Sequence, residues 1–355
     1  MKLNAPPASA GVPKALLVVA LLIAAGAGSV ASAVYFELRV AGTPGPSPGP
    51  GSVTVADDLG RLVTAPLNAS RVVVLAPSVM DIVYRLGLRD RVVGIGCTTS
   101  IVGGMANEYS PNQTALWDLS PSMCIPDDPS LDAEGVAELQ PQLVLASTIT
   151  SEEDIGTLSS TYHLPVLILA PSGLPGVVGD VELVAELFPS VAPVAANLEA
   201  TLQQTIYNAS SFDSSLSVNN DSIPSVFVTY GFYGGTYYTY GPGTFGQSLV
   251  EYAGGSSISS GVPLAYYGLN ATVVLADQPA VIFFGTSTND PYLVAGQTPD
   301  VWSSSAPYWS ELNGTKIGID VTLVTEADPT MVLALPTFLH DLHPSLYPAP
   351  TVAPG

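Results

Sequence analysis

The residues of this 355-residue chain that could do chemistry are above all tyrosines. Six aromatic side chains crowd into the eleven residues Tyr230–Tyr240, and Tyr266 and Tyr267 follow soon after. Rigid aromatic faces with hydroxyl tips suit a flat macrocycle or a catecholate chelate, and a phenolate can also ligate ferric iron. The alternative is an aromatic-rich β-hairpin whose rings pack on one another.

Motifs of catalysis are weak or missing. Gly241–Gly246 fits the spacing G-x-G-x-x-G, but Val262–Tyr267 lacks the acidic residue that a dinucleotide site needs about twenty positions on. The sequence contains neither G-x-S-x-G nor H-E-x-x-H. The acidic pair Asp127 and Asp128 and the acidic run Glu152–Asp154 are typical of a loop turn and a helix N-terminus. We therefore expect no enzyme and no cofactor.

Metal ligands and thiols are few. The sequence has three histidines, His163 before a predicted strand and His340 and His343 in a C-terminal helix, and we expect structural roles for all three. A free metal ion would need a cluster of His or carboxylate side chains. Cys97 and Cys124 can form one disulfide in an oxidising exterior or remain two buried thiols.

The bulk composition limits the partners and sets the size of the core. Lys and Arg total 9 against 30 Asp and Glu, a formal charge of -21, so we expect no nucleic acid as a partner. Hydrophobic residues make up 47% of the chain, enough for two α/β lobes.

The N-terminal segment predicts that the rest of the chain lies outside the cell. Residues 15–36 carry no charge and could span a bilayer, with residues 1–14 in the cytoplasm. The alternative is a cleaved signal, since Ala31–Ala33 fits a small-residue cleavage site. Residues 37–52 are rich in Pro and Gly and predict an extracellular spacer. Six Asn-x-Ser/Thr sequons are candidate glycosylation sites: Asn68, Asn112, Asn208, Asn220, Asn270 and Asn313.

The rest of the chain alternates predicted strands and helices, which is typical of parallel α/β sheets. A hairpin over Val53–Thr64 opens an N-terminal lobe, 53–174. In it, Ser78 is expected to cap a helix with Asp81 as the partner of a capping box. Residues 175–213 predict a long linker helix, or a pair broken at Pro189 and Pro193. A C-terminal lobe follows over 214–350, with a strand at Ser225–Thr229 and a loop from Tyr230 to Gly243.

The two lobes share an internal repeat. Shifting Leu131–Val144 by 138 residues places it on Leu269–Ile282, with identical residues at five positions: Leu131/Leu269, Ala133/Ala271, Val136/Val274, Gln140/Gln278 and Pro141/Pro279. In both copies a short helix, a proline and a strand follow one another. The repeat predicts two similar lobes with a ligand cleft between them.

An ordered set of segments resembles the periplasmic-type binding proteins for cobalamin and ferric siderophores, the class with a rigid helical linker. The matching segments are Asp57–Arg61, Arg71–Ser78, Leu86–Gly94, Glu138–Ala146, Gly241–Phe245, Tyr252–Gly255, Met331–Leu335 and Leu342–Pro344. The resemblance implies a monomeric solute-binding protein that delivers a metal chelate, of the iron-siderophore, cobalamin or haem type, to an ABC permease dimer with its ATPase. It also implies two α/β lobes with mainly parallel sheets. The non-transport alternative is a membrane-anchored sensor or surface adhesion module with the same fold.

The resemblance also implies site residues. Family ligands touch loops that follow the strands, and the ligand-binding residues here would be Ser78, Ser147, Thr148, Tyr230, Tyr233, Tyr238 and Tyr266. The family docks on its permease through one acidic residue in each lobe, and the matching positions are Glu134 and Glu251. The alternative is that both are ordinary solvated helix residues. Basic residues are scarce in these loops, which favours neutral or cationic chelates over highly anionic siderophores.

Overall fold

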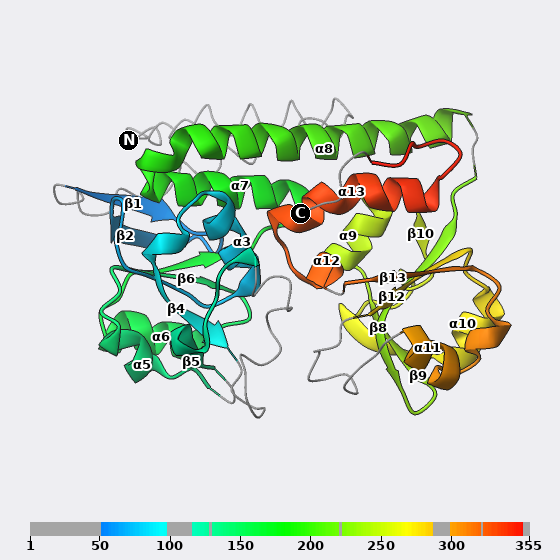
Figure 1. Ribbon diagram of the computed structural model, residues 1–355, viewed down its shortest axis with the longest axis horizontal. Helices are drawn as coiled ribbons and strands as arrows, with labels where there is room; N and C mark the ends of the chain where they lie inside the picture. Colours follow the sequence, from blue (N-terminus) through cyan, green and yellow to red (C-terminus); the bar gives the residue numbers. More distant parts are fainter. Residues whose placement is uncertain are drawn as a thin grey trace, which may run out of the picture. The chain divides into compact units, whose positions relative to one another are not determined.

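The computed structural model describes residues 51–97, 116–127, 130–219, 222–286, 299–320 and 322–350 (Figure 1). The predicted membrane segment at 15–36, most of the spacer, and the sequons Asn112 and Asn220 lie outside these residues. Among the helices that are described, none is long and apolar enough to cross a membrane. The described part begins with the predicted hairpin, β1 (Ser52–Ala56) and β2 (Leu62–Pro66), paired antiparallel.

The first lobe is built on a five-stranded parallel sheet of order β5-β4-β3-β6-β7. Its strands are β3 (Val72–Val74), β4 (Val92–Cys97), β5 (Cys124–Pro126), β6 (Leu143–Ser147) and β7 (Val166–Leu169). Side chains alternate between its faces: Val72 and Val74 pack with the core that includes α3 and α7, whereas Val73 packs with α5 and α6. The helices are α3 (Pro77–Arg85), α5 (Ala133–Glu138), α6 (Glu152–Gly156) and α7 (Gly173–Leu187), and short helical turns occupy Arg89–Arg91, Pro121–Met123 and Thr157–Thr161.

The second lobe has a mixed sheet of order β11-β9-β8-β12-β13, with β10 paired to the start of β8. Its strands are β8 (Ser225–Tyr233), β9 (Thr236–Tyr240), β10 (Ser256–Ser257), β11 (Tyr266–Asn270), β12 (Val281–Gly285) and β13 (Thr315–Ile319). Strands β10, β8, β12 and β13 run parallel. On the other side of β8, β9 pairs antiparallel with β8, and β11 pairs antiparallel with β9. Its helices are α9 (Phe245–Tyr252), α10 (Ala271–Asp277), α11 (Pro299–Ser305), a turn at Trp309–Glu311, α12 (Thr322–Thr325) and α13 (Pro329–Leu342).

The predicted linker is a broken pair of helices, α7 and α8 (Ala192–Asn219), which pack side by side (Figure 1). The break falls at Phe188, since the residue before a proline disfavours the α conformation and Pro189 follows it. Pro193 lies in the first turn of α8, where a missing N–H costs no helix bond. One continuous apolar core joins α3 and α7 with α8, α9 and α13.

The internal repeat is confirmed in the backbone. Strands β6 and β12 lie 138 residues apart, and each pairs in parallel with a strand on either side. Val136 and Val274 are fully buried. Gln140 and Gln278 both adopt the left-handed conformation, with φ of 46° and 42°, before the proline that leads into the strand.

Three sequence expectations were wrong in detail. Ser78 does not cap α3: the helix begins at Pro77, whose fixed φ suits a first helical residue, and the N-cap is Ala76 without a side-chain bond. Asp81 therefore turns inward instead of closing a capping box. The segment Tyr230–Gly243 is mostly not a loop, because β8 and β9 form a hairpin across Gly234 and Gly235.

Candidate functional site

The carboxyl edge of the first sheet gathers three predicted ligand residues. Strands β3 and β6 are parallel neighbours, so the segments that follow them leave at the same edge. Ser78 lies in the first turn of α3 and is half-buried. Ser147 is buried at the end of β6 and its hydroxyl accepts a hydrogen bond from the backbone N–H of Ile149 at 3.4 Å, while Thr148 is exposed.

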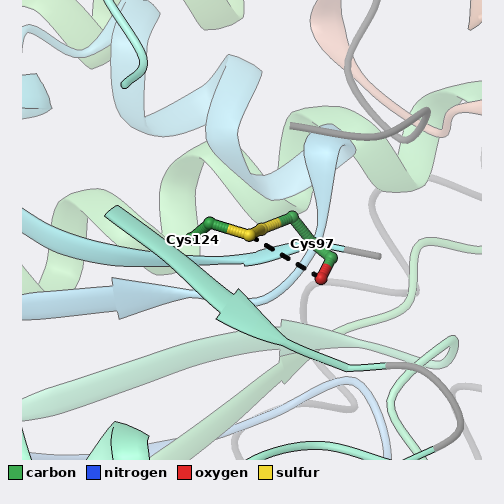
Figure 2. The surroundings of a disulfide bond; sticks show 2 residues. All are labelled: Cys97 and Cys124. Atoms are coloured by element: carbon green, nitrogen blue, oxygen red, sulfur yellow. Dashed lines mark hydrogen bonds between the residues drawn. A yellow bond between two sulfur atoms is a disulfide. The ribbon is translucent and has the colours of Figure 1, made fainter. Parts of the chain in front are cut away.

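A disulfide links the two strands next to this edge, β4 and β5. Cys97 ends β4 and Cys124 begins β5, and the two are joined with a Cα–Cα distance of 5.6 Å (Figure 2). Because Cys124 pairs in register with Ile95, the bridge ties the point at which the chain leaves β4 to the adjacent strand. Of the two states that the sequence left open for these cysteines, the structure has the paired one. The residues that directly follow β4, 98–115, lie outside the described part of the chain.

In the second lobe, a tyrosine cluster lies on one face of the β9 hairpin. Tyr230 of β8 has its ring centroid 6.1 Å from that of Tyr238 and 5.0 Å from that of Tyr240. Tyr266 of β11 lies 5.8 Å from Tyr240. Tyr230, Tyr238, Tyr240 and Tyr266 thus lie together, and we call these four residues the tyrosine cluster. Their rings pack on one another in a hairpin, as in the alternative interpretation of the sequence. Tyr233 lies apart at the hairpin tip, where 70% of it is exposed.

Tyr240 was missed as a candidate, although the strand period could have found it, since it lies two residues from Tyr238 and shares its face. Tyr237 points to the opposite face, where its ring packs against Phe227 and stacks parallel to Trp302. Its hydroxyl donates to the carbonyl of Pro307 at 2.6 Å. Burial raises the pKa of Tyr237 well above its ordinary value, so this phenol is a structural group and not an exposed metal ligand.

The predicted docking acids are both exposed and lie on non-equivalent helices. Glu134 is in the first turn of α5, where Asp132 caps the helix by accepting from the N–H of Gly135 at 2.9 Å. Glu251 is on α9, and its carboxylate accepts a hydrogen bond from Gln247 at 2.9 Å. Under the repeat, the counterpart of Glu134 in the second lobe is Thr272 and not Glu251.

The glycines of Gly241–Gly246 have structural roles. A side chain at Gly241 would collide with the carbonyl of Leu264, and Gly243 has a φ of 83°. Thr244 then caps α9 by accepting from the N–H of Gln247 at 3.2 Å. This segment thus joins β9 to α9, and its glycines are explained without a nucleotide.

Two of the histidines also serve structure. His343 is buried, and its Nε2 lies 3.1 Å from the carbonyl oxygen of Gly254, the left-handed residue that ends α9. His340 Nδ1 lies 2.9 Å from the carbonyl oxygen of Tyr347. Among the described residues, no group of three or more His, Cys, Asp or Glu could hold a metal ion.

A buried polar cluster joins helices of the two lobes. Arg85 of α3 donates to both carboxylate oxygens of Asp81 and, at 2.6 Å, to the hydroxyl of Thr330 on α13. Asp328 caps α13 by accepting from the N–H of Met331 at 2.8 Å. Burial, followed by repulsion from Asp81, raises the pKa of Asp328 well above the usual carboxyl range.

Four candidate glycosylation sites are exposed in the described part: Asn68, Asn208, Asn270 and Asn313. Their carboxamides are hydrogen-bonded to different degrees. Asn270 caps α10 and accepts from the hydroxyl of Thr272 in its own sequon at 2.7 Å. Asn313 donates from Nδ2 to Gln278 at 3.0 Å, so this nitrogen is already engaged in the fold.

The family follows from comparison with known proteins. A family model described as periplasmic binding protein matches residues 72–304. The chain therefore belongs to the periplasmic binding protein family, whose members are solute-binding proteins and not enzymes. A cobalamin-binding protein of Halobacterium salinarum is 26% identical over 242 residues, covering 67% of this chain. The match spans only 59% of that relative's length.

Solved structures support the fold. A periplasmic heme binding protein from Pseudomonas aeruginosa has a TM-score of 0.62 and 17% identity, covering 78% of this chain and 94% of its own. The periplasmic vitamin B12 binding protein of Vibrio cholerae has a TM-score of 0.60 and 16% identity, covering 78% of this chain and 98% of its own. The α/β fold with two lobes is thereby confirmed.

Proposed function

We propose that this chain is the extracellular solute-binding component of an ABC importer and captures a metal chelate. The observation that carries the proposal is the tyrosine cluster, in which Tyr230, Tyr238, Tyr240 and Tyr266 have ring centroids 5.0–6.1 Å apart. Tyr240 is only 2% exposed and packs against Tyr230 and Tyr266, whereas those two rings and Tyr238 keep accessible surface that can stack on a flat macrocycle. Family membership and the names of the relatives, which refer to cobalamin, heme and vitamin B12, support the same ligand class.

Ligand capture would involve both lobes. In the first lobe, Ser78, Ser147 and Thr148 supply hydroxyl groups at the carboxyl edge of the sheet. In the second lobe, the tyrosine cluster and Tyr233 supply aromatic area. Because one apolar core runs through α7, α8 and α13, we propose a small closing motion and not a wide hinge.

The ligand part of the proposal is tested by calorimetry with cyanocobinamide, cyanocobalamin, haemin and iron(III) trihydroxamates. At least one should bind, and Tyr238→Ala should weaken it by about 2- to 10-fold, the usual contribution of one aromatic contact. Tyr207→Ala is the matched control, because Tyr207 is 66% exposed on α8 and belongs to no part of the proposed site. Equal losses for the two variants would contradict the role of the tyrosine cluster.

Delivery would use Glu134, and Glu251 as the second acid, against arginines of the permease dimer. The transporter reconstituted in proteoliposomes should lose uptake with Glu134→Lys, whereas ligand binding in solution should be unchanged. Glu138→Lys is the matched control, since Glu138 is exposed on the same helix. Full uptake by the double variant of Glu134 and Glu251 would end this assignment.

The N-terminal segment would tether the protein to the outer face of the membrane. Membranes from the host should retain the full chain through an alkaline carbonate wash, whereas a form lacking residues 1–36 should be released. Release of the full chain, with a new N-terminus near Ala33, would instead establish a cleaved signal. Glycopeptide mass spectrometry of the same material tests the sequons.

A further inference from the structure

The folded part of this chain contains six cationic side chains in all. The sequence has 9 Lys and Arg, of which Lys2, Lys14 and Arg39 precede the described residues. The internal segments that the structure leaves undescribed contain no Lys or Arg in their sequence. The remaining cations are Arg61, Arg71, Arg85, Arg89, Arg91 and Lys316.

Two of the six are neutralised by buried carboxylates. Arg61 forms an ion pair with Asp57 at 2.6 Å and also donates to the carbonyl of Val166 at 3.0 Å. Arg85 forms an ion pair with Asp81 at 2.9 Å. Both acidic side chains are fully buried, so each guanidinium compensates a charge inside the protein.

The other four cations donate to main-chain carbonyls. Arg71 donates to Leu139, and Arg91 to Asn68 and Ala69. Arg89 donates to the carbonyls of Trp117 and Asp118. Lys316 donates to Leu312 and lies 5.5 Å from the ring centroid of Trp309. These side chains hold main-chain segments in place, and in the described structure they form no group of cationic donors at the candidate ligand residues.

Their positions relative to the sheets matter more than their bonds. Arg71 directly precedes β3, Arg91 directly precedes β4, and Lys316 is the second residue of β13, so all three are at the amino ends of parallel strands. At about 3.3 Å per residue, strands of three to six residues put roughly 10–20 Å between the amino and carboxyl edges. At that separation none of these three cationic groups can hydrogen-bond or form an ion pair with a ligand at the carboxyl edge.

The carboxyl edges carry the opposite sign. Asp127 directly follows β5 and Asp320 directly follows β13, and both are half-buried. The other candidate ligand residues described at the site bear hydroxyl groups and no charge. An anion enclosed there would lose its hydration, meet carboxylates and find no described cation to replace the lost water.

We propose that the ligand of this protein carries no net negative charge and is a neutral or cationic metal chelate with an amide- or hydroxyl-rich periphery. The proposal rests on the proposed function and specifies the chemistry of that ligand. It separates chelates that share one metal core but differ in peripheral charge. Polycarboxylate and tris-catecholate complexes would be rejected, whereas amide-bearing corrinoids and neutral or cationic trihydroxamates would be accepted.

The test uses two scaffolds in which charge varies and the metal core does not. The first is an iron(III) linear trihydroxamate with a terminal amine, used free (cationic), acetylated (neutral) and succinylated (anionic). The second is a corrinoid with intact peripheral amides, compared with its product of amide hydrolysis to carboxylates. Calorimetry should show binding of the uncharged or cationic form of at least one scaffold, with its anionic form weaker by roughly ten-fold or more.

Equal or tighter binding of the anionic form would overturn the charge inference while leaving the proposed function intact. Binding of haemin, which carries two carboxylates, would overturn the charge inference in the same way. Failure of haemin and of every form of both scaffolds would instead count against the proposed function, and the inference would fall with it. These two failures are therefore distinguishable in one data set.

A charge-insertion variant provides the second arm. Thr148→Arg places a cation on the exposed residue after β6, and Thr148→Gln is the uncharged control of similar reach. The ratio of affinities for the anionic and the acetylated form should rise by roughly ten-fold in the arginine variant relative to the glutamine variant. Identical discrimination by the two variants would contradict the claim that the missing cation at this edge sets ligand charge.

Discussion

Removing Arg85 should expose how strongly the two lobes depend on one buried ion pair. Arg85 Nε lies 3.0 and 2.9 Å from the two oxygens of Asp81, whose side chain is fully buried. In Arg85→Met the carboxylate keeps only the bonds from Thr330, from its N–H and its hydroxyl, both at 3.0 Å. Breaking a buried pair on one side costs about 3–5 kcal/mol, and we expect about 3 kcal/mol because Thr330 remains.

The loss should be read from urea unfolding followed by circular dichroism, with the slope and midpoint fitted together. Asp81→Asn combined with Arg85→Met removes both charges and should recover most of the loss, leaving about 1 kcal/mol. Arg71→Met is the matched control, since that exposed guanidinium bonds only a main-chain carbonyl and should cost about 1 kcal/mol or less. A loss for Arg85→Met no larger than the control would refute the reasoning.

Three further outcomes follow from the described contacts. In the folded state the pKa of Asp328 is raised, so the protonated carboxyl stabilises the fold at low pH. That contribution to the free energy of unfolding is lost as pH rises from about 3.9 through the raised pKa. Asp328→Asn should flatten that part of a pH–stability profile, and an unchanged profile would contradict this. Replacing Cys97 and Cys124 by Ser opens a loop with a sequence separation of 27 and should cost about 3–4 kcal/mol in thermal or urea unfolding, a prediction that fails if reduction leaves the wild-type midpoint unmoved. Gly254→Ala forces a side chain onto a φ of 71° in a crowded site and should cost about 2 kcal/mol, whereas Gly261→Ala, which meets nothing within 4 Å, should be neutral in the same assay.

Local and repeated features of the fold could be predicted from sequence. The helix, proline and strand that recur with a shift of 138 residues were confirmed. The structure adds that Gln140 and Gln278 share a left-handed conformation. The N-caps Ser151 and Thr244 are equally local features, because a cap depends on residues within one turn. The break between α7 and α8 followed from Pro189 for the same local reason.

Features set by distant partners could not be predicted. Asp81 fits a capping box by spacing, yet its actual partners include Thr330, which is 249 residues away. Strand β5 lies inside a stretch that predicts irregular structure, because three residues carry no period and only pairing with β4 makes them a strand. Tyr230 and Tyr266 share a cluster only because β9 lies between their strands.

The charge of the candidate site depends on one feature that the sequence shows and on another that only the structure shows. The scarcity of Lys and Arg was visible in the sequence, and it predicted a base-poor site. The hydrogen-bond partners of each guanidinium could not be predicted, since bonds such as those of Arg89 to the carbonyls of Trp117 and Asp118 depend on tertiary packing. Because those bonds engage the described Lys and Arg side chains elsewhere, the scarcity of cations supports the proposal that the ligand carries no net negative charge.

Native mass spectrometry of the full-length protein from its own host tests whether this chain carries a metal chelate. We expect a protein mass increased by one ligand that is released on denaturation, with one cobalt or iron per chain by elemental analysis. The released species should carry no net negative charge in neutral solution. A metal-free preparation that also binds none of the offered corrinoids, haemin or trihydroxamates would contradict the account.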